Sequence, residues 1–380
     1  MKRILITLLL ITIATPFIPH SGAAKWLAFH TARVLAATVT RYVDTGSSGG
    51  NGTTNAVSGA NAAYATLAAC EAAEDGVDHS GNDVVIHCNR TNGGGSDTAQ
   101  AYFYGWTVDS IKIIADDFPS DGKYDDTKYE LKVTNASALV NRDETVTIEN
   151  LQINNIATGT SGANGIKMYG GTGVTTVNSC HIVGTSSSTG DVYGIAAFEH
   201  GTVNNTIIRD QVNGADSGHY GVICSSSAVI TLNNCTIYNC YYGVRELSGT
   251  ASCYNCAVGS CADDFSGVTN IQYCCSDDGD DTGAGTAQTP LDGDWDNEFN
   301  NAANGDFSLK SGGNCVDNAS ATYAPADDII GTARPQGAAD DIGAFEYVEE
   351  APAGAAQVIS IIMSGIPEYF SANYRDRKAA

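Results

Sequence analysis

A few cations lie among short apolar segments in the middle of this acidic chain. Lys167 and Arg245 each follow a Gly-Ile or Gly-Val step, and Arg209, Asp210 and His219 belong to the stretch "RDQVNGADSGHYG". A carboxylate beside cations and an imidazole suits proton abstraction or sugar binding. These five residues are therefore the candidate glycan-binding residues, although charged residues on solvated loops are also the usual outcome of folding.

Two dense runs of carboxylates follow, "SDDGDDTG" from Ser276 and "DGDWDNE" from Asp292. Calcium takes about six to eight oxygen ligands, which loops of this kind supply, although their spacing does not match an EF-hand. Solvated acidic turns are the commoner outcome, and no cofactor is required; Ca²⁺ is the one ion that we expect such loops to take. The candidate Ca²⁺ ligands are Asp277, Asp278, Asp280 and Asp281.

The strands that must position these residues can be recognised from a repeat in the sequence. Apolar residues fall at i, i+2, i+5 and i+7 of each copy, and Asn mostly occupies the break in this alternation. Alternation is typical of a strand with one buried face, and Asn tolerates the left-handed backbone of a tight corner. Each copy is thus predicted to be a strand, a corner and a strand. The six copies start at Val146, Thr175, Gly201, Ile230, Ala251 and Thr269.

A third strand lies upstream of the copies, as in "NGIKMYGG" and "YGVRELSG". Three short strands per repeat predict an all-β parallel β-helix solenoid, in which equivalent residues of successive coils stack about 4.8 Å apart. We expect the corner amides to bond along the axis as a ladder and the next residues to fill the bore. The ladder amides are Asn150, Asn205, Asn234 and Asn255, and the bore residues after them are Cys180, Cys235, Cys256 and Cys274.

With this repeat the chain resembles the pectin-lyase-like superfamily of right-handed parallel β-helices, whose corners carry Asn ladders and whose bore is often capped by an N-terminal helix. "TRYVDTGSSGGNGT" and the following "NAAYATLAACEAAED" look like the usual opening, which implies a cap helix at about 62–75. "DFSLKSGGNCVDNA" and "IIGTARPQGAADDIGAFEY" resemble the end of β-helix proteins with a choice-of-anchor Q domain. The resemblance spans roughly residues 40–347. It implies the fold but not the chemistry, because the superfamily holds lyases, hydrolases, adhesins and phage tailspikes.

The domain boundaries follow from these segments. Residues 1–24 are predicted to be a signal peptide, because Lys2 and Arg3 precede an apolar run that is shorter than the roughly 20 residues of a membrane span. The alternative is an uncleaved membrane anchor. The remaining divisions are an N-terminal segment without assignment at 25–38, a β-helix domain at 39–347 with its clearest repeats at 146–276 and its closing region at 305–347, and a linker and tail at 348–380.

The net charge of the chain limits the classes of molecule that it is expected to bind. A net charge of −24 repels nucleic acid and anionic lipid, whereas neutral glycans carry no such penalty. An acidic polysaccharide would need Ca²⁺ or a local basic patch. We therefore expect a polysaccharide or cell-surface glycan as partner, no nucleic acid, and no stable membrane insertion after signal cleavage. A homo-oligomer remains open.

The twelve cysteines leave two interpretations open. In an exported chain they suggest disulfides, and stacked coils bring Cα atoms within disulfide range, first for Cys235 with Cys256 and Cys240 with Cys261. Free Cys is also among the most buried residue types, so the bore column suits buried thiols. Zinc is disfavoured, because these cysteines belong to a strand template.

Three functions are compatible with this pattern. The favoured one is a secreted, cell-surface or (if phage-encoded) virion-surface protein that presents an elongated surface to polysaccharide. The first alternative is a polysaccharide lyase or glycoside hydrolase of the same fold, although the hydrolases' paired Asp followed by Gly-His-Gly finds no match. The second alternative is a purely structural surface or tail-fibre component.

Overall fold

The computed structural model describes residues 37–91, 93–142, 144–171, 173–212, 218–279 and 295–349. The predicted signal peptide lies outside the described residues, as do Asp280 and Asp281 and nearly all of the predicted tail. The described residues from Thr38 to Glu349 form one compact unit. Within the described ranges, no helix has the length and hydropathy needed to cross a membrane.

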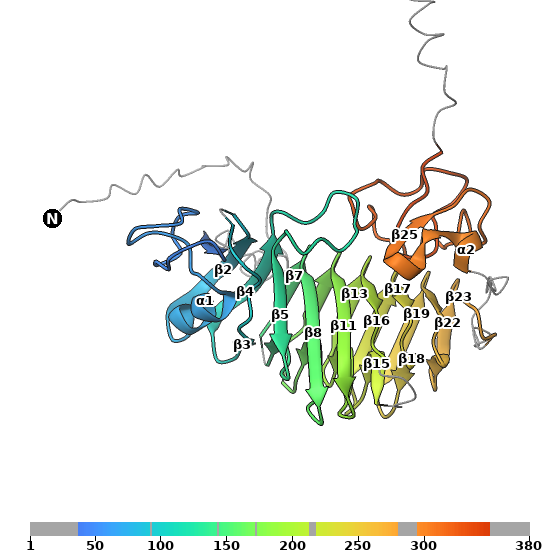
Figure 1. Cartoon of the computed structure of the whole chain (residues 1–380), viewed down its shortest axis with the longest axis horizontal. Helices are drawn as coiled ribbons and strands as arrows, with labels where there is room; N and C mark the ends of the chain where they lie inside the picture. Colours follow the sequence, from blue (N-terminus) through green and yellow to red (C-terminus); the bar gives the residue numbers. More distant parts are fainter. Residues whose placement is uncertain are drawn as a thin grey trace, which may run out of the picture. The chain divides into compact units, whose positions relative to one another are not determined.

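Three parallel sheets run along the coil, and from β4 onward the chain visits them in the order A, B, C (Figure 1). Sheet A contains β1 (Ala37–Asp44), β2 (Asp78–Asn89), β4 (Thr107–Ala115), β7 (Val146–Glu149), β10 (Thr175–Asn178), β13 (Gly201–Asn204), β16 (Val229–Asn233), β19 (Thr250–Tyr254) and β22 (Asn270–Gln272). Sheet B contains β5 (Glu130–Thr134), β8 (Gln152–Gly159), β11 (His181–Ser188), β14 (Ile207–Arg209), β17 (Thr236–Tyr238), β20 (Ala257–Gly259) and β23 (Cys275–Ser276). Sheet C contains β3 (Ala101–Phe103), β6 (Leu139–Asn141), β9 (Ala163–Met168), β12 (Val192–Ala197), β15 (His219–Cys224), β18 (Tyr242–Glu246) and β21 (Asp263–Ser266).

The strand register matches the columns of the repeat. In sheet A, Val177 pairs with Ile148 on one side and Val203 on the other. In sheet B, Ile182 pairs in the same way with Ile153 and Ile208. All of these side chains are fully buried in one hydrophobic cluster that follows the bore. The predicted parallel β-helix with three strands per coil is therefore confirmed.

The corner between sheets A and B is a single residue with left-handed backbone. The six corner residues have φ values between 47° and 59°, a region that Asn tolerates better than most residues. This confirms that the break in the alternation is a corner. The corner residues are Asn150, Ser179, Asn205, Asn234, Asn255 and Tyr273.

The amide ladder differs from the prediction, because most of it runs one column earlier. Asn204 Nδ2 donates to Asn178 Oδ1 at 2.8 Å, and Asn233 Nδ2 donates to Asn204 Oδ1 at 2.8 Å. In the corner column, only Asn255 Nδ2 donates to another described corner amide, Asn234 Oδ1, at 3.0 Å. Paired residues at the ends of successive parallel strands repeat at the coil spacing, so their amides reach one another.

Corner amides also bind a segment from the C-terminal part of the domain. Asn205 Nδ2 donates to the Asp327 carbonyl at 2.7 Å, and Asn234 Nδ2 donates to the Asp341 carbonyl at 2.8 Å. We call residues 295–349 the closing segment. It contains α2 (Trp295–Glu298), β24 (Phe299–Asn301), η1 (Ala302–Asn304) and β25 (Asp306–Leu309), and it includes the predicted closing region at 305–347.

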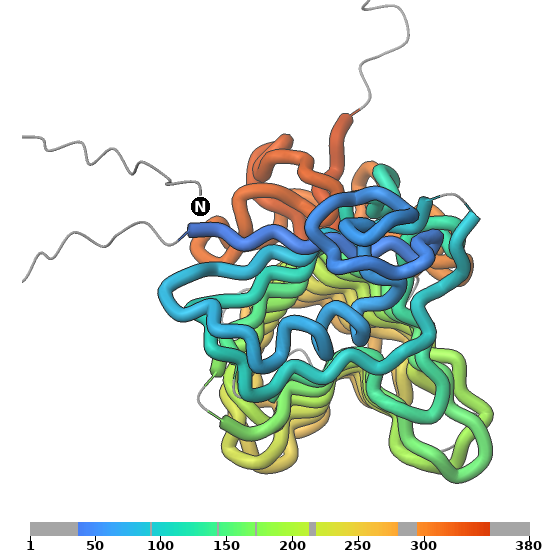
Figure 2. Tube along the Cα trace, turned by 90° about the vertical axis from the view of Figure 1, so that its left-hand side faces the viewer, coloured from blue at the N-terminus to red at the C-terminus, as the bar shows by residue number. Residues whose placement is uncertain are grey.

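The closing segment covers the outer face of sheet B with a second hydrophobic cluster. Phe299, Phe307 and Phe345 pack there against Ile207 and Ala257 of the sheet. The segment and strands β15 and β18 of sheet C lie on opposite sides of the coil (Figures 1 and 2). The outer face of sheet B is thus largely buried in the last coils, whereas sheet C is not covered by this segment.

Helix α1 (Leu67–Glu74) is the predicted cap helix, although it is shorter than residues 62–75. Thr66 caps it, since its side-chain oxygen accepts a hydrogen bond from the Ala69 amide at 3.0 Å. Leu67 and Cys70 join the cluster in the bore, and the helix is seen in front of the coil in Figure 2.

The predicted bore cysteines Cys180, Cys235, Cys256 and Cys274 are all fully buried, and all twelve cysteines of the chain are free thiols in the structure. Burial raises the pKa of Cys180 to about 12, so this thiol stays protonated at neutral pH. The predicted position of the cysteine column is confirmed, and neither of the two suggested disulfides is present.

We expect the folded protein to resist alkylation by iodoacetamide, because a thiol that is buried and protonated is a poor nucleophile. Cys261, which is only partly buried, should react first and serves as an internal reference. After denaturation without reductant, all twelve cysteines should be modified, as measured by intact mass. Cysteines that stay unmodified under these conditions would show that disulfides have formed.

Candidate functional site

Arg209 and Asp210 lie on the covered side of the coil. Arg209 ends β14 in sheet B; its Nε donates to His181 Nε2 at 3.1 Å and its Nη1 is paired with Asp210. Gly305 of the closing segment packs against the guanidinium. Burial, reinforced by Arg209, lowers the pKa of His181 to about 3, so this imidazole is neutral and accepts the hydrogen bond. The cluster is therefore an internal part of the contact between sheet B and the closing segment.

His219 is also unavailable to a ligand on the outer surface. It is the first residue of β15 and is fully buried, with its Nε2 at 3.0 Å from Ser186 Oγ. The structure thus does not bring the predicted group together. Arg209 and Asp210 lie at the end of β14 in sheet B, His219 is buried in the interior, and Arg245 lies on the outer face of sheet C. The sequence pattern does not reveal which strands the closing segment covers.

Lys167 and Arg245 do share one surface, the outer face of sheet C. The register aligns Lys167, Ala196, Ile223 and Arg245 on neighbouring strands β9, β12, β15 and β18, which is the line that the alternation predicts. Within the described part of the chain, neither Lys167 nor Arg245 forms an ion pair, whereas Arg209 and Arg334 do. Both cations are partly exposed, and neither has a carboxylate at contact distance among the described residues.

A row of tyrosines crosses the same face beside Arg245. Tyr193 and Tyr220 stack with ring centroids 5.1 Å apart and planes only 5° apart, and Tyr242 continues the row at 5.2 Å from Tyr220. Arg245 Cζ lies 4.2 Å from the centroid of Tyr242. Tyr241 meets Tyr242 edge-on at 4.9 Å. Equivalent positions on successive coils thus form a row of three rings with a cation on it, in which Tyr242 is tilted by 49° from Tyr220.

A second group of rings and cations lies further toward the N-terminal coils. Lys167 Nζ is 4.8 Å from the Tyr169 ring centroid and 5.6 Å from that of Phe198. Arg142 Cζ is 4.8 Å from the ring centroid of Tyr104. Tyr104 and Tyr169 are 46% and 44% exposed, which is high for aromatic residues. We call the two groups together the aromatic face: Tyr104, Arg142, Lys167, Tyr169, Tyr193, Phe198, Tyr220, Tyr241, Tyr242 and Arg245.

The sequence analysis missed half of this face. Lys167 and Arg245 were among its candidates, whereas Arg142, Tyr104, Tyr169 and Phe198 were not. A usable signal was present, because Tyr169 and Phe198 each stand three residues after the aliphatic residue of the Gly-Ile step. Aromatic residues at one position of two neighbouring repeats must stack side by side in a parallel β-helix.

The described half of the predicted calcium loop does not offer free oxygens. Asp277 accepts hydrogen bonds from the Ser260 amide and from Trp295 Nε1, and Asp278 accepts from the Asp264 amide and Ser276 Oγ. Burial, with contributions from Cys261 and the two neighbouring carboxylates, raises the pKa of Asp264 to about 10, so its carboxyl is protonated. Among the described residues, no group of three metal-ligating side chains is placed to hold an ion. Because Asp280 and Asp281 lie outside the described residues, calcium binding here stays a prediction.

Comparisons with known proteins add little to this geometry. No protein-family model matches the chain, and no curated protein matches it either. Among solved structures, it is similar to one described as the crystal structure of pectate lyase Pel9A, with 13% sequence identity and a TM-score of 0.40, over 83% of this chain and 98% of that chain. At this TM-score the similarity decides nothing about chemistry, and the fold assignment stands on the strand register. The resemblance to choice-of-anchor Q proteins stays a prediction.

Proposed function

We propose that the protein binds polysaccharide along the aromatic face of sheet C. The observation that supports this most is the row of Tyr193, Tyr220 and Tyr242 with Arg245 lying on it. Flat aromatic side chains offer apolar surface with a polar rim, which complements the face of a sugar ring. Because the row repeats at the coil spacing, it suits a polymer that presents one ring after another.

The cations on this face set the kind of polymer that is favoured. Arg245 and Lys167 are local positive charges on a chain whose net charge is −24. A glycan that carries some acidic groups would meet cations here and repulsion elsewhere on the protein, so it would be bound at this face. This proposal includes the location expected from the sequence, outside the cell or on a virion surface, because such polymers are found there.

The two alternative functions differ from binding in the products and the retained polymer that an incubation would show. A polysaccharide lyase or glycoside hydrolase would release unsaturated products or new reducing ends from the bound polymer. A purely structural component would retain no polymer at all. One set of incubations with polygalacturonate, alginate and arabinoxylan therefore separates all three, provided that both retention and products are measured.

The binding itself is tested with the double variant Lys167→Gln/Arg245→Gln. Retention in affinity gels that contain each polymer should fall at least about tenfold for the polymer that binds, since two charge-assisted contacts are lost. The melting temperature should change only slightly, because both side chains are on the surface and partly exposed, where substitutions usually alter stability by about 0.5 kcal/mol or less.

The matched control is Lys112→Gln/Lys132→Gln, which removes the same charge from sheets A and B. Both control lysines are similarly exposed, at 40% and 38% of their side-chain surface. The control should keep full retention. Equal losses in the two double variants would mean that only net charge matters, and unchanged retention in the sheet C variant would reject the aromatic face as the site.

A further inference from the structure

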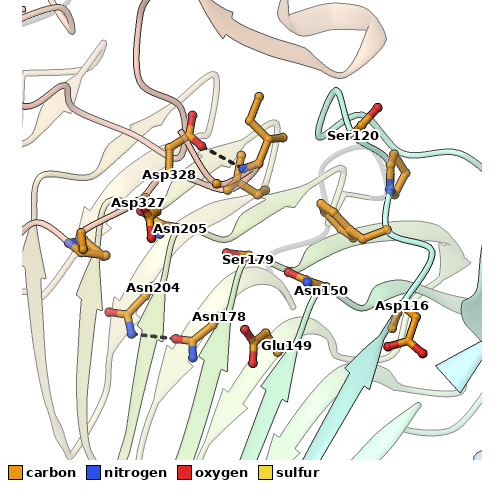
Figure 3. Close-up of a pocket in the computed structure, with 18 residues that line it drawn as sticks. Asp116, Ser120, Glu149, Asn150, Asn178, Ser179, Asn204, Asn205, Asp327 and Asp328 are labelled. Atoms are coloured by element: carbon orange, nitrogen blue, oxygen red, sulfur yellow. Dashed lines mark hydrogen bonds between the residues drawn. The ribbon is translucent and has the colours of Figure 1, made fainter. Parts of the chain in front are cut away.

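A pocket of about 500 Å³ opens over the corners between sheets A and B (Figure 3). Its floor is formed by corner residues Asn150, Ser179 and Asn205 and by the strand-end residues Asn178 and Asn204. The loop at 115–120 and the closing segment at 325–331 form its walls. Its volume lies in the range of about 300–1,000 Å³ that is typical of small-ligand sites. No residue of the aromatic face lines it.

The amides of the floor have unused hydrogen-bonding groups. Asn205 is 5% exposed, and although its Nδ2 donates to the Asp327 carbonyl, its Oδ1 is buried without a partner. An unpaired buried acceptor is unfavourable, so a small local shift that lets a ligand donor reach Asn205 Oδ1 would be compensated by the new hydrogen bond. Asn178 Oδ1 accepts from Asn204, and its Nδ2 has no acceptor among the described residues. The floor thus presents both an acceptor and a donor.

The charges around the pocket disfavour an anionic ligand. Three of its carboxylates are already engaged: Asp116 with His87, Glu149 with Lys112, and Asp328 with the Ile330 and Thr332 amides. Asp327 is the remaining carboxylate of the lining, which includes no Lys or Arg. An anionic ligand would be repelled, and the described residues contain no cluster that fits a metal ion.

The walls add apolar surface to these polar groups. Phe118, Pro119, Pro325 and Ile330 line the pocket beside the amides. A ligand that fits must have several hydroxyl groups, no net negative charge and one apolar face. We infer that this pocket binds a neutral saccharide unit, whose hydroxyls meet Asn178, Asn205 and Asp327 and whose ring packs against Phe118 and Ile330. This second site is independent of the polymer proposed for sheet C.

The test uses the full chain and ligand-observed NMR with the methyl glycosides of glucose, galactose and N-acetylglucosamine, with galacturonate as the anionic counterpart. At least one neutral glycoside should bind at millimolar concentration, and galacturonate should bind more weakly. Binding should persist in the presence of a chelator and in the Lys167→Gln/Arg245→Gln variant. Loss of binding in that variant would place the ligand on the aromatic face and overturn the inference.

Two variants test the pocket itself. Ser179→Asn places a larger side chain in the floor at a corner with φ of 50°, where Asn is the usual residue. Asn205→Gly keeps the left-handed corner but removes the amide. Both should weaken binding at least about tenfold. Ser226→Asn, at an exposed position with φ of 56° that does not line the pocket, is the matched control and should bind as the parent does.

Four further results would overturn the inference: parent-like affinity in a folded Ser179→Asn variant, tighter binding of galacturonate than of every neutral glycoside, dependence on a divalent cation, or no binding of any neutral glycoside. Thermal unfolding of each variant shows whether it is folded. If Asn205→Gly loosens the closing segment, Ser179→Asn still decides, because it leaves the bond between Asn205 and Asp327 intact.

Discussion

Replacing Asn234 by Leu should lower the free energy of unfolding by about 3–5 kcal/mol. Asn234 is fully buried at a corner with φ of 51°. Its Nδ2 donates to the Asp341 carbonyl and its Oδ1 accepts from Asn255 Nδ2, so Leu removes two buried hydrogen bonds, although Arg334 still donates to that carbonyl and Asn255 still donates to Ser320. Leu also adapts poorly to left-handed backbone. Urea denaturation followed by circular dichroism measures the change.

The matched control for this substitution is Ser226→Leu. Ser226 has the same left-handed backbone, with φ of 56°, but it is exposed. It therefore carries only the conformational cost, about 1 kcal/mol. Similar values for the two variants would mean that the bonds between the corner and the closing segment contribute nothing, and that the corner alone explains the preference for Asn.

Replacing Arg334 by Met should cost about 3–5 kcal/mol, because it leaves a buried carboxylate without its partner. Arg334 Nη1 is 2.9 Å from Glu346 Oε2, and both side chains are buried. Its two terminal nitrogens also donate to the carbonyls of Asp341 and Gly343 at 3.0 Å each. Burial raises the pKa of Glu346 even in the native pair, and without the guanidinium we expect this pKa to rise further.

The pH dependence of this variant has a definite sign. A carboxyl whose pKa is raised by folding stabilises the native state at low pH and loses that contribution as the pH rises. The free energy of unfolding that Arg334→Met loses relative to the parent should therefore become smaller as the pH is lowered from 8 to 5, as measured by urea denaturation. Lys123→Met is the control: its partner Asp306 is at 2.9 Å but Lys123 is 44% exposed, so it should cost at most about 1 kcal/mol at either pH. A loss of unfolding free energy that grows toward low pH would contradict the explanation by protonation of Glu346.

The fold could be predicted because each coil repeats the same pattern of strand, corner and strand. The alternation of Val177 and Ile182 about their corner, and the Gly-aliphatic step at Ile195, are enough to fix which side chains face the bore and which strands pair. Register in a parallel solenoid follows from the repeat spacing, so the columns could be aligned without coordinates. The ladder was misplaced by one column, since Asn204 and Asn205 are chemically alike and only the path of the closing segment distinguishes them.

The candidate site was predicted less well for the same reason. Whether Arg209 or Arg245 reaches solvent depends on which sheet the closing segment covers, and that segment has no repeat from which its path could be inferred. Its hydrophobic residues, such as Phe299 and Phe307, indicate that it must cover something, but not what. His219 looks like a loop residue beside charged neighbours, yet its place as the first residue of β15 puts it inside the coil.

The closing segment also determines how long the β-helix is. It contacts the loop between β4 and β5 through Phe118 and through the ion pair of Lys123 with Asp306, and it bonds to the corner of a much later coil through Asn255 and Ser320. A repeat gained or lost between these two points would shift one contact against the other by about 4.8 Å. Solenoids usually change length by duplication of internal units. In this chain, duplication between residues 130 and 255 would separate the closing segment from one of its two anchors, so the number of coils in that span is fixed by the segment that follows them.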